Sequence, residues 1–203
     1  MASTTRDARR PRARRPGGRS ARVRAAALTA ALEELADNGY SALSLERVAR
    51  RAGVHKTTLY RRWGTREELV LDAMLDRATE GIPVRDTGSL RNDLLELARG
   101  SAATVSTPEV EALARAVAAG APRDAKLAAA TRRFWTQRLA LDGEIVERAI
   151  ARGEVPAGTR PGPMIEAVLG PLYFRLLVTG EPVDPEFIEG VVDLVIEGVA
   201  RPA

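Results

Sequence analysis

The sequence predicts an all-α protein with two helical domains, and its composition and its apolar spacing both support this prediction. Of the 203 residues, 45% are hydrophobic and 35 are alanine, whereas only eight are aromatic. Residues that favour helices therefore outnumber the β-branched and aromatic residues that favour strands. Apolar residues recur at helical spacing in segments that glycine and proline separate. An all-β fold is disfavoured, and the loop at 81–88 is the expected domain boundary.

Four helices are expected before this loop. The first covers about 22–37, ends at Asn38-Gly39 and has an apolar face of Leu28, Ala31, Leu32 and Leu35. A second, short helix follows the N-cap residue Ser44 and ends before Gly53. A third helix contains Leu59 and Trp63 on one face. Gly64 ends it, and Thr65-x-x-Glu68 predicts a capping box for the fourth.

The rest of the chain is also expected to be helical. Helices should start at Ser89 and at Thr107-Pro108, and a long helix should lie within 122–152 and end at Gly153. After a loop at 153–162, two apolar helices are predicted at 163–179 and 185–200. Pro171 lies inside the first of these and predicts a kink, because proline lacks the backbone donor and clashes with the preceding turn.

Positive charge is concentrated in the first third of the chain. Residues 1–75 contain 16 Lys/Arg and 8 Asp/Glu, a net charge of +8, whereas residues 76–203 contain 15 and 19, a net charge of −4. Residues 1–24 alone hold nine arginines. We expect residues 1–21 to form a disordered Arg-rich arm. Such an arm either binds DNA phosphates or remains a solvated tail, and the sequence leaves both readings open.

The composition disfavours several other classes of protein. The chain has no cysteine and a single histidine, His55, which excludes disulfides and thiolate zinc sites and leaves little for a catalytic triad. Glu33 and Glu34 interrupt the one apolar run that follows basic residues, so the sequence does not predict a secretory signal. No apolar run is long enough to span a membrane. We expect a cytoplasmic protein without a cofactor.

Residues 44–63 combine a short helix, a glycine turn and a second short helix, the arrangement of a helix-turn-helix. Leu59 and Trp63 are expected to anchor the second helix, which leaves Thr57 and Arg61 on the opposite face. Arginine and threonine read base edges, and threonine, tyrosine and lysine bind phosphates. Residues 22–80 are therefore predicted to form a DNA-binding domain whose partner is double-stranded DNA.

The combined pattern resembles the tetracycline-repressor (TetR) family. It consists of Gly39-Tyr40, Leu45-x-x-Val48-Ala49-x-x-Ala52-Gly53-Val54-x-x-x-Thr58-Leu59-Tyr60-x-x-Trp63 and Thr65-Arg66-Glu67-Glu68-Leu69. The resemblance implies a three-helix DNA-binding domain, then a divergent ligand-binding and dimerisation domain, here 81–203. It also implies contacts to bases and backbone from Lys56, Thr57 and Tyr60. Further residues match positions that usually meet phosphate: Ser44, Arg47, Thr58, Arg62 and Arg66.

Two residues depart from the family pattern. His55 replaces a small polar residue at the start of the recognition helix, and it is either a partly exposed cap or a base contact. Glu46 places a negative charge near the expected DNA backbone.

The second domain is expected to hold an effector cavity between helices, within residues 90–180. Its candidate lining residues are Phe134, Trp135, Arg138, Met164, Leu169 and Tyr173. The alternative is that these residues are ordinary core. Alanine-rich helices with a Gly-Pro kink pack incompletely, which favours an apolar or amphipathic small-molecule effector. An inward Arg138 would favour an anionic or carbonyl group, whereas a surface Arg138 would not.

A homodimer is expected through the helices at 163–179 and 185–200, because their apolar residues exceed the need of one packed face. The surplus residues are Leu169, Leu172, Leu176, Val191, Val195 and Ile196.

The favoured function is a ligand-responsive repressor that binds a palindromic operator and is released by its effector. The alternatives are an all-helical enzyme with an incidental helix-turn-helix and a nonspecific DNA-binding protein. No phosphate loop or Gly-x-Ser-x-Gly supports the enzyme.

Overall fold

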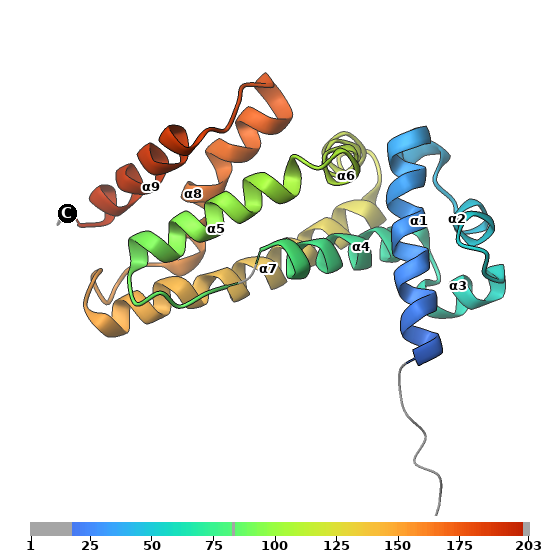
Figure 1. Cartoon of the computed structure of the whole chain (residues 1–203), viewed down its shortest axis with the longest axis horizontal. Helices are drawn as coiled ribbons and strands as arrows, with labels where there is room; N and C mark the ends of the chain where they lie inside the picture. The colour runs from blue at the N-terminus through green and yellow to red at the C-terminus, as the bar shows by residue number, and fades with distance from the viewer. Residues whose placement is uncertain (1–17, 83, 201–203) are drawn as a thin grey trace, which may run out of the picture.

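The computed structural model describes residues 18–82 and 84–200, and over these ranges the chain forms helices and no strand (Figure 1). The predicted all-α fold is thereby confirmed. Residues 1–17 of the predicted arm lie outside the described residues. No helix in the described part is both long enough and apolar enough to cross a bilayer.

The first four helices are α1 (Gly18–Ala42), α2 (Leu45–Arg51), α3 (Lys56–Trp63) and α4 (Arg66–Gly81). Helix α1 begins four residues earlier than expected, so residues 18–21 are helical and do not belong to a disordered arm. The arginines and alanines around residue 21 are good helix formers, which explains the extension. Gly39 has φ 70° and ψ 172°, and it interrupts α1 at the predicted stop.

The caps and turns of the helix-turn-helix follow from its sequence. The Ser44 hydroxyl accepts a hydrogen bond from Arg47 N at 3.3 Å, and Gly53 adopts φ 65° between α2 and α3. Only half of the predicted capping box forms. Thr65 Oγ1 accepts from Glu68 N at 3.3 Å, but the Glu68 carboxylate pairs with Arg133 on α7 at 2.6 Å.

The second half contains α5 (Leu90–Val105), α6 (Pro108–Gly120), α7 (Ala125–Arg152), α8 (Pro161–Phe174) and α9 (Pro185–Ala200). The starts predicted after Ser89 and Thr107 and the stop at Gly153 are confirmed. The helix predicted at 163–179 starts at Pro161, and its last turn, η1 (Arg175–Thr179), is π-helical. Pro171 lies inside α8, and the π-helical turn begins four residues after it. The kink expected at Pro171 itself stays a prediction.

Two hydrophobic cores exist, and they do not divide at residues 81–88. The first joins α1–α4 with Leu113 and Val117 of α6 and the start of α7. The second joins α5, α7, α8 and α9 with Leu71 and Ala78 of α4. Helix α4 thus contributes to both cores, and α6 lies against α1 (Figure 1). The loop marks where the chain leaves α4, whereas the packing of the two domains is shared through α4 and α6.

The apolar residues predicted to be left over for a partner are partly misassigned. Leu169 and Leu172 are buried within their own chain, with 5% and 1% of their surface exposed. The most exposed large apolar side chains of α8, η1 and α9 are instead Phe174, Val178 and Leu194. A helical period alone could not separate the face toward α5 and α7 from the outer face, because both faces are apolar.

Candidate DNA-binding interface and effector pocket

Helix α3 presents one buried face and one exposed polar face. Leu59 is fully buried and Trp63 is 8% exposed, so both anchor the helix as predicted. The side chains on the outer face are exposed, except for the half-buried Thr58. The face and the helix start comprise His55, Lys56, Thr57, Thr58, Tyr60, Arg61 and Arg62. The outer face of α3 therefore carries cationic and hydroxyl groups on a short helix of the kind that enters a DNA groove.

A polar network under α3 fixes its orientation. Trp63 Nε1 donates to Asp72 Oδ2 on α4 at 2.9 Å. Arg24 on α1 donates to both oxygens of Asp72, at 2.6 and 3.1 Å, and also to Asp76. Burial would raise the pKa of Asp72, but the hydrogen bonds from Arg24 and Trp63 outweigh it and lower this pKa. The ionised Asp72 thus ties three helices together.

Glu46 and Tyr60 are hydrogen-bonded to each other on the exposed face of α2 and α3. Tyr60 lies on α3 with 45% of its surface exposed, and its hydroxyl donates to Glu46 Oε1 on α2. This hydrogen bond lowers the pKa of Glu46 and raises that of Tyr60. Glu46 therefore stays ionised beside Lys56. The Tyr60 hydroxyl has to leave the carboxylate before it can donate to a phosphate.

Two of the arginines expected at phosphates are engaged within the protein. Arg47 Nε donates at 2.8 Å to Glu34, whose side chain is nearly buried on α1. The Arg66 guanidinium stacks over the Tyr40 ring at 4.3 Å and donates to Glu67 at 2.9 Å. The Arg66 guanidinium is held within the protein by these contacts, and its contact to phosphate stays a prediction. The sequence pattern gives a residue's position on a helix but not the partner toward which a long side chain turns.

Arg66 belongs to a polar junction between the two halves of the chain. The Tyr40 hydroxyl donates to Glu67 at 3.0 Å and to Asp124, the N-cap residue of α7, at 3.3 Å. Arg66 reaches the same Asp124 oxygen at 3.5 Å. Burial opposes ionisation of Glu67, yet the hydrogen bonds from Arg66 and Tyr40 lower its pKa. Sequence reasoning missed this junction because its members are far apart along the chain.

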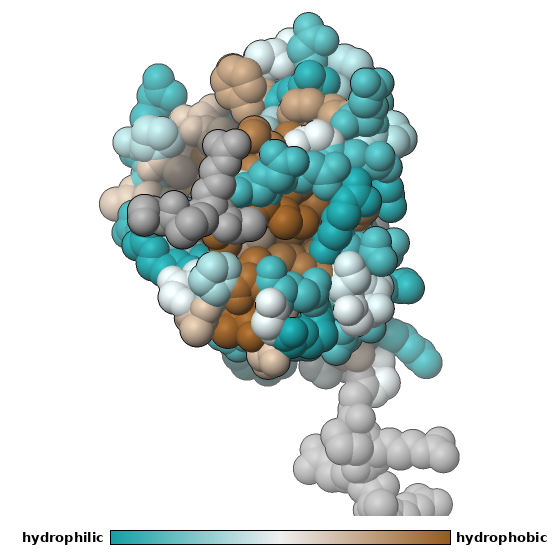
Figure 2. All heavy atoms as spheres, turned by 90° about the vertical axis from the view of Figure 1, so that its left-hand side faces the viewer, coloured by the Kyte–Doolittle hydropathy of each residue, from teal (hydrophilic) through white to brown (hydrophobic). Residues whose placement is uncertain are grey.

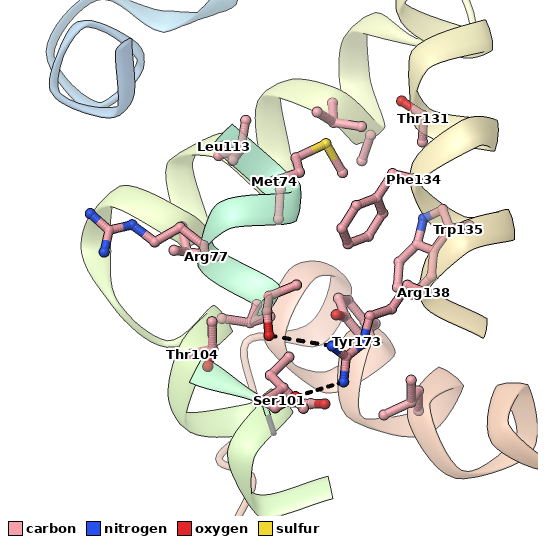
Figure 3. Close-up of a pocket in the computed structure, with 18 of the residues that line it drawn as sticks. Met74, Arg77, Ser101, Thr104, Leu113, Thr131, Phe134, Trp135, Arg138 and Tyr173 are labelled. Atoms are coloured by element: carbon pink, nitrogen blue, oxygen red, sulfur yellow. Dashed lines mark hydrogen bonds between the residues drawn. The ribbon is translucent and has the colours of Figure 1, made fainter. Parts of the chain in front are cut away.

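A cavity of about 230 Å³ lies between α4, α5, α6, α7 and α8 (Figure 3). Of the predicted residues, Phe134, Trp135, Arg138, Leu169 and Tyr173 line it. Met164 does not line it and is corrected to a core residue, 3% exposed, beside a groove between α8 and α9.

The wall of the cavity extends beyond the predicted range of 90–180. The additional lining residues include Met74, Arg77 and Ala78 on α4. Leu113 and Val117 on α6 also line it, and they belong to the core of the DNA-binding half. The alanine-rich α6 was the available signal, because small side chains leave space beside a helix.

Arg138 points inward, with 5% of its surface exposed, and its partner is Asp142. Arg138 Nε donates to Asp142 Oδ2 at 2.8 Å, and Nη2 lies 2.5 Å from Oδ1. Figure 3 also shows its bonds to the end of α4, where Ala78 O and Ile82 O accept at 3.3 and 2.9 Å. Burial raises the pKa of Asp142, and the charge of Arg138 opposes this rise.

Aromatic rings form one side of the cavity. The rings of Phe134 and Trp135 meet edge to face at 5.0 Å between centroids, and those of Trp135 and Tyr173 do so at 5.4 Å. Together with Leu113 and Val117 they make an apolar enclosure. A partly open, apolar space of this kind suits a small, largely apolar ligand.

Over the residues that the structure describes, the chain is helical, with an exposed helix-turn-helix and an apolar cavity between α4 and the later helices. This arrangement is typical of DNA-binding regulators. Profiles of two families agree with this class. "Bacterial regulatory proteins, tetR family" matches residues 27–73, and "Tetracyclin repressor-like, C-terminal domain" matches residues 84–195.

Similar proteins cover almost the whole chain. AqdR, an HTH-type transcriptional regulator of Rhodococcus erythropolis, is 33% identical over 89% of this chain and 86% of its own. A DNA-binding transcriptional repressor TetR of Mycobacteroides abscessus is 34% identical over 88% and 94%. The crystal structure of the TetR family transcription regulator SCO0332 superposes with a TM-score of 0.74 at 33% identity, over 88% and 99%. The chain belongs to the TetR family of DNA-binding transcriptional regulators.

Proposed function

We propose that this regulator is a ligand-responsive repressor that binds a palindromic operator as a homodimer and leaves it when a small apolar molecule enters the cavity. One observation carries the proposal: the cavity wall and the DNA-binding core share helices. Helix α4 gives Met74 and Ala78 to the wall and Leu69 to the core under α3, and α6 gives Leu113 to both. A ligand that displaces either helix therefore changes the position of α3.

Repression is supported by the relative from Mycobacteroides abscessus, whose name describes a DNA-binding transcriptional repressor. We further propose a cytoplasmic regulator that acts by binding and not by catalysis. Release of the operator requires that the ligand bind more tightly to the conformer whose recognition helices are displaced. A ligand with equal affinity for both conformers does not change their populations.

Selection of genomic fragments by the purified protein tests the DNA-binding part of the proposal. Lys56→Ala combined with Tyr60→Ala should abolish specific binding without unfolding, because both side chains are exposed on α3. Lys126→Ala removes one exposed positive charge from α7 and serves as the control. Normal operator selection by the double variant would contradict the proposed interface. Equal affinity of the wild type for bulk DNA would instead favour the nonspecific alternative.

Glu46 offers a sharper test of the same surface. Its carboxylate repels phosphates and holds the Tyr60 hydroxyl. Glu46→Gln should therefore strengthen binding to operator and to bulk DNA by the same factor, most at low salt. A loss of affinity for the operator alone would show that Glu46 accepts a hydrogen bond from a base, as a carboxylate does from cytosine N4.

The homodimer is proposed from the outer apolar face of α8, η1 and α9. Phe174, Val178 and Leu194 are 57%, 71% and 71% exposed. Figure 2 shows apolar side chains at the surface near the end of α9, among polar ones. An exposed apolar face favours association with a second copy through the same surface.

Sedimentation of variants tests this interface. Leu194→Asp should give monomers with weak operator binding. Leu141→Asp alters an exposed leucine on α7, 42% exposed, and should leave the dimer intact. A monomeric wild type at micromolar concentration would refute the proposed dimer.

Ligand response can be followed through Trp135, whose ring lines the cavity. Quenching of its fluorescence by a candidate effector should parallel the release of a labelled operator. Trp135→Phe keeps an aromatic wall and should lose most of the quenching, because the remaining tryptophan, Trp63, lies in the other core. Operator release without quenching would place the effector elsewhere.

A further inference from the structure

The charged groups of the cavity are already paired. Among the described lining residues the charged ones are Arg77, Arg138 and Asp142. Arg77 pairs with Glu80 at 3.3 Å on the exposed side of α4. Arg138 and Asp142, which is fully buried, form a two-point ion pair at 2.8 and 2.5 Å. The buried positive charge therefore has a full negative counter-charge within the protein.

The other N–H donors of the Arg138 guanidinium are also largely hydrogen-bonded within the protein. Nη1 donates to Ala78 O and Nη2 donates to Ile82 O, at the C-terminal end of α4. The C-terminal end of a helix carries partial negative charge, so it adds to the compensation from Asp142. An anionic ligand at this place would meet no unpaired cation. It would lose its hydration without a compensating partner.

Three hydroxyl groups that line the cavity are not occupied in this way, those of Ser101, Thr104 and Tyr173. The Thr131 hydroxyl donates to Leu127 O at 2.9 Å, whereas these three make no side-chain hydrogen bond with the residues that the structure describes. Ser101 is 2% exposed, and Figure 3 draws it and Tyr173 at the Arg138 end of the cavity. Burial raises the pKa of Tyr173 to about 12, so its hydroxyl stays neutral at physiological pH. The hydroxyls of Ser101 and Tyr173 are available to an uncharged oxygen.

We propose that the cavity selects uncharged, largely aromatic or aliphatic molecules with one carbonyl or hydroxyl oxygen, and that it excludes carboxylates and other anions because Asp142 leaves Arg138 with no uncompensated charge. This inference rests on the proposed effector role and names its ligand class. The sequence predicts that an inward Arg138 favours an anionic or carbonyl group, and the proposal keeps the carbonyl and rejects the anion. The oxygen of the ligand bonds to Tyr173 and Ser101, and its apolar part lies against Trp135 and α6.

Two fluorescent probes that differ by one charged group test the exclusion of anions. N-phenyl-1-naphthylamine is neutral, and its 8-sulfonate derivative is an anion. The wild type should bind the neutral probe at least tenfold more tightly. Asp142→Asn leaves the charge of Arg138 uncompensated and should raise the affinity for the sulfonate at least tenfold, with little change for the neutral probe.

A second variant keeps the test decisive if Asp142→Asn does not fold. Arg138→Met combined with Asp142→Leu replaces the pair by apolar residues of similar size and should keep the preference for the neutral probe. Comparable affinity of the wild type for both probes, or an unchanged sulfonate affinity in folded Asp142→Asn, would overturn the exclusion of anions.

The role of the hydroxyls is tested by displacement of the bound neutral probe. Tyr173→Phe and Ser101→Ala should each weaken displacement by 1-naphthol several-fold and leave displacement by naphthalene unchanged. Equal effects on both competitors would refute the proposed hydrogen bonds.

The outcomes also separate this inference from the proposed function. Selective binding of the neutral probe by a protein whose operator affinity no neutral ligand changes would refute the effector role and leave the selectivity standing. Failure of the folded wild type to bind any of the probes would refute both.

Discussion

Replacement of Asp72 by alanine is expected to destabilise the DNA-binding half and to misplace α3. Asp72 accepts two hydrogen bonds from Arg24 and one from Trp63. Hydrogen bonds to a charged group contribute about 1.5–3 kcal/mol each when well shielded. The side chains of Arg24 and Asp72 are 30% and 26% exposed, so solvent weakens the pair, and we discount it to about 1 kcal/mol. With the Trp63 bond, the expected loss is about 2–3 kcal/mol.

Urea unfolding at fixed protein concentration measures this loss, because a dimer's apparent stability depends on concentration. Asp72→Asn retains an acceptor for Trp63 and should lose about half as much. Asp76→Asn removes the charge of a carboxylate that accepts only a single bond from Arg24 and serves as the control. Because the folded pKa of Asp72 is lowered, its contribution is complete above the unfolded pKa of about 3.9 and is lost as pH falls through the folded pKa. Equal stabilities of Asp72→Ala and Asp76→Asn would refute this reasoning.

Three further predictions concern packing and buried charge. Leu59→Ala should cost about 3 kcal/mol in urea unfolding, because Leu59 is fully buried under α3, and a loss below about 1 kcal/mol would contradict this. Gly81→Ala should lower the Tm, since its Cβ would lie 2.2 Å from Thr104 Oγ1. An added Thr104→Ala should recover part of the loss, because only the Thr104 Cβ at 3.2 Å remains, and a Tm that the second change does not raise would refute the clash. Arg138→Met should cost about 3–5 kcal/mol at neutral pH by leaving Asp142 unpaired, and Asp142→Leu in the same chain should recover most of it. Burial already raises the pKa of Asp142, so the single variant should lose stability as pH rises from 4 to 8, and a flat profile would contradict this.

The helices and the turn of the DNA-binding half could be predicted from sequence because their determinants are local. Ser44 and Gly64 act within one turn of their own helix, and the period of Leu59 and Trp63 fixes the buried face of α3. The same local rules predicted the start of α5 after Ser89.

The partners of long side chains could not be predicted in this way. Arg66 occupies a position where the family meets phosphate, yet its guanidinium lies on Tyr40, 26 positions away in the sequence. The sequence left open whether Arg138 points inward or lies at the surface, and it is the buried i,i+4 pair with Asp142 that accompanies the inward orientation. That pair was visible in the sequence, whereas the contribution of α4 to the cavity depends on the tertiary packing of α4 against α7.

The most direct test of the account is the thermodynamic coupling between the cavity and the operator. The operator affinity is measured with and without a neutral ligand that quenches Trp135, and the ligand affinity is measured with and without operator. Linkage requires the same factor in both directions. We predict a reciprocal loss of at least tenfold, about 1.4 kcal/mol, for the wild type. A ligand that fills the cavity and leaves the operator affinity unchanged would contradict the central claim that this cavity controls DNA binding.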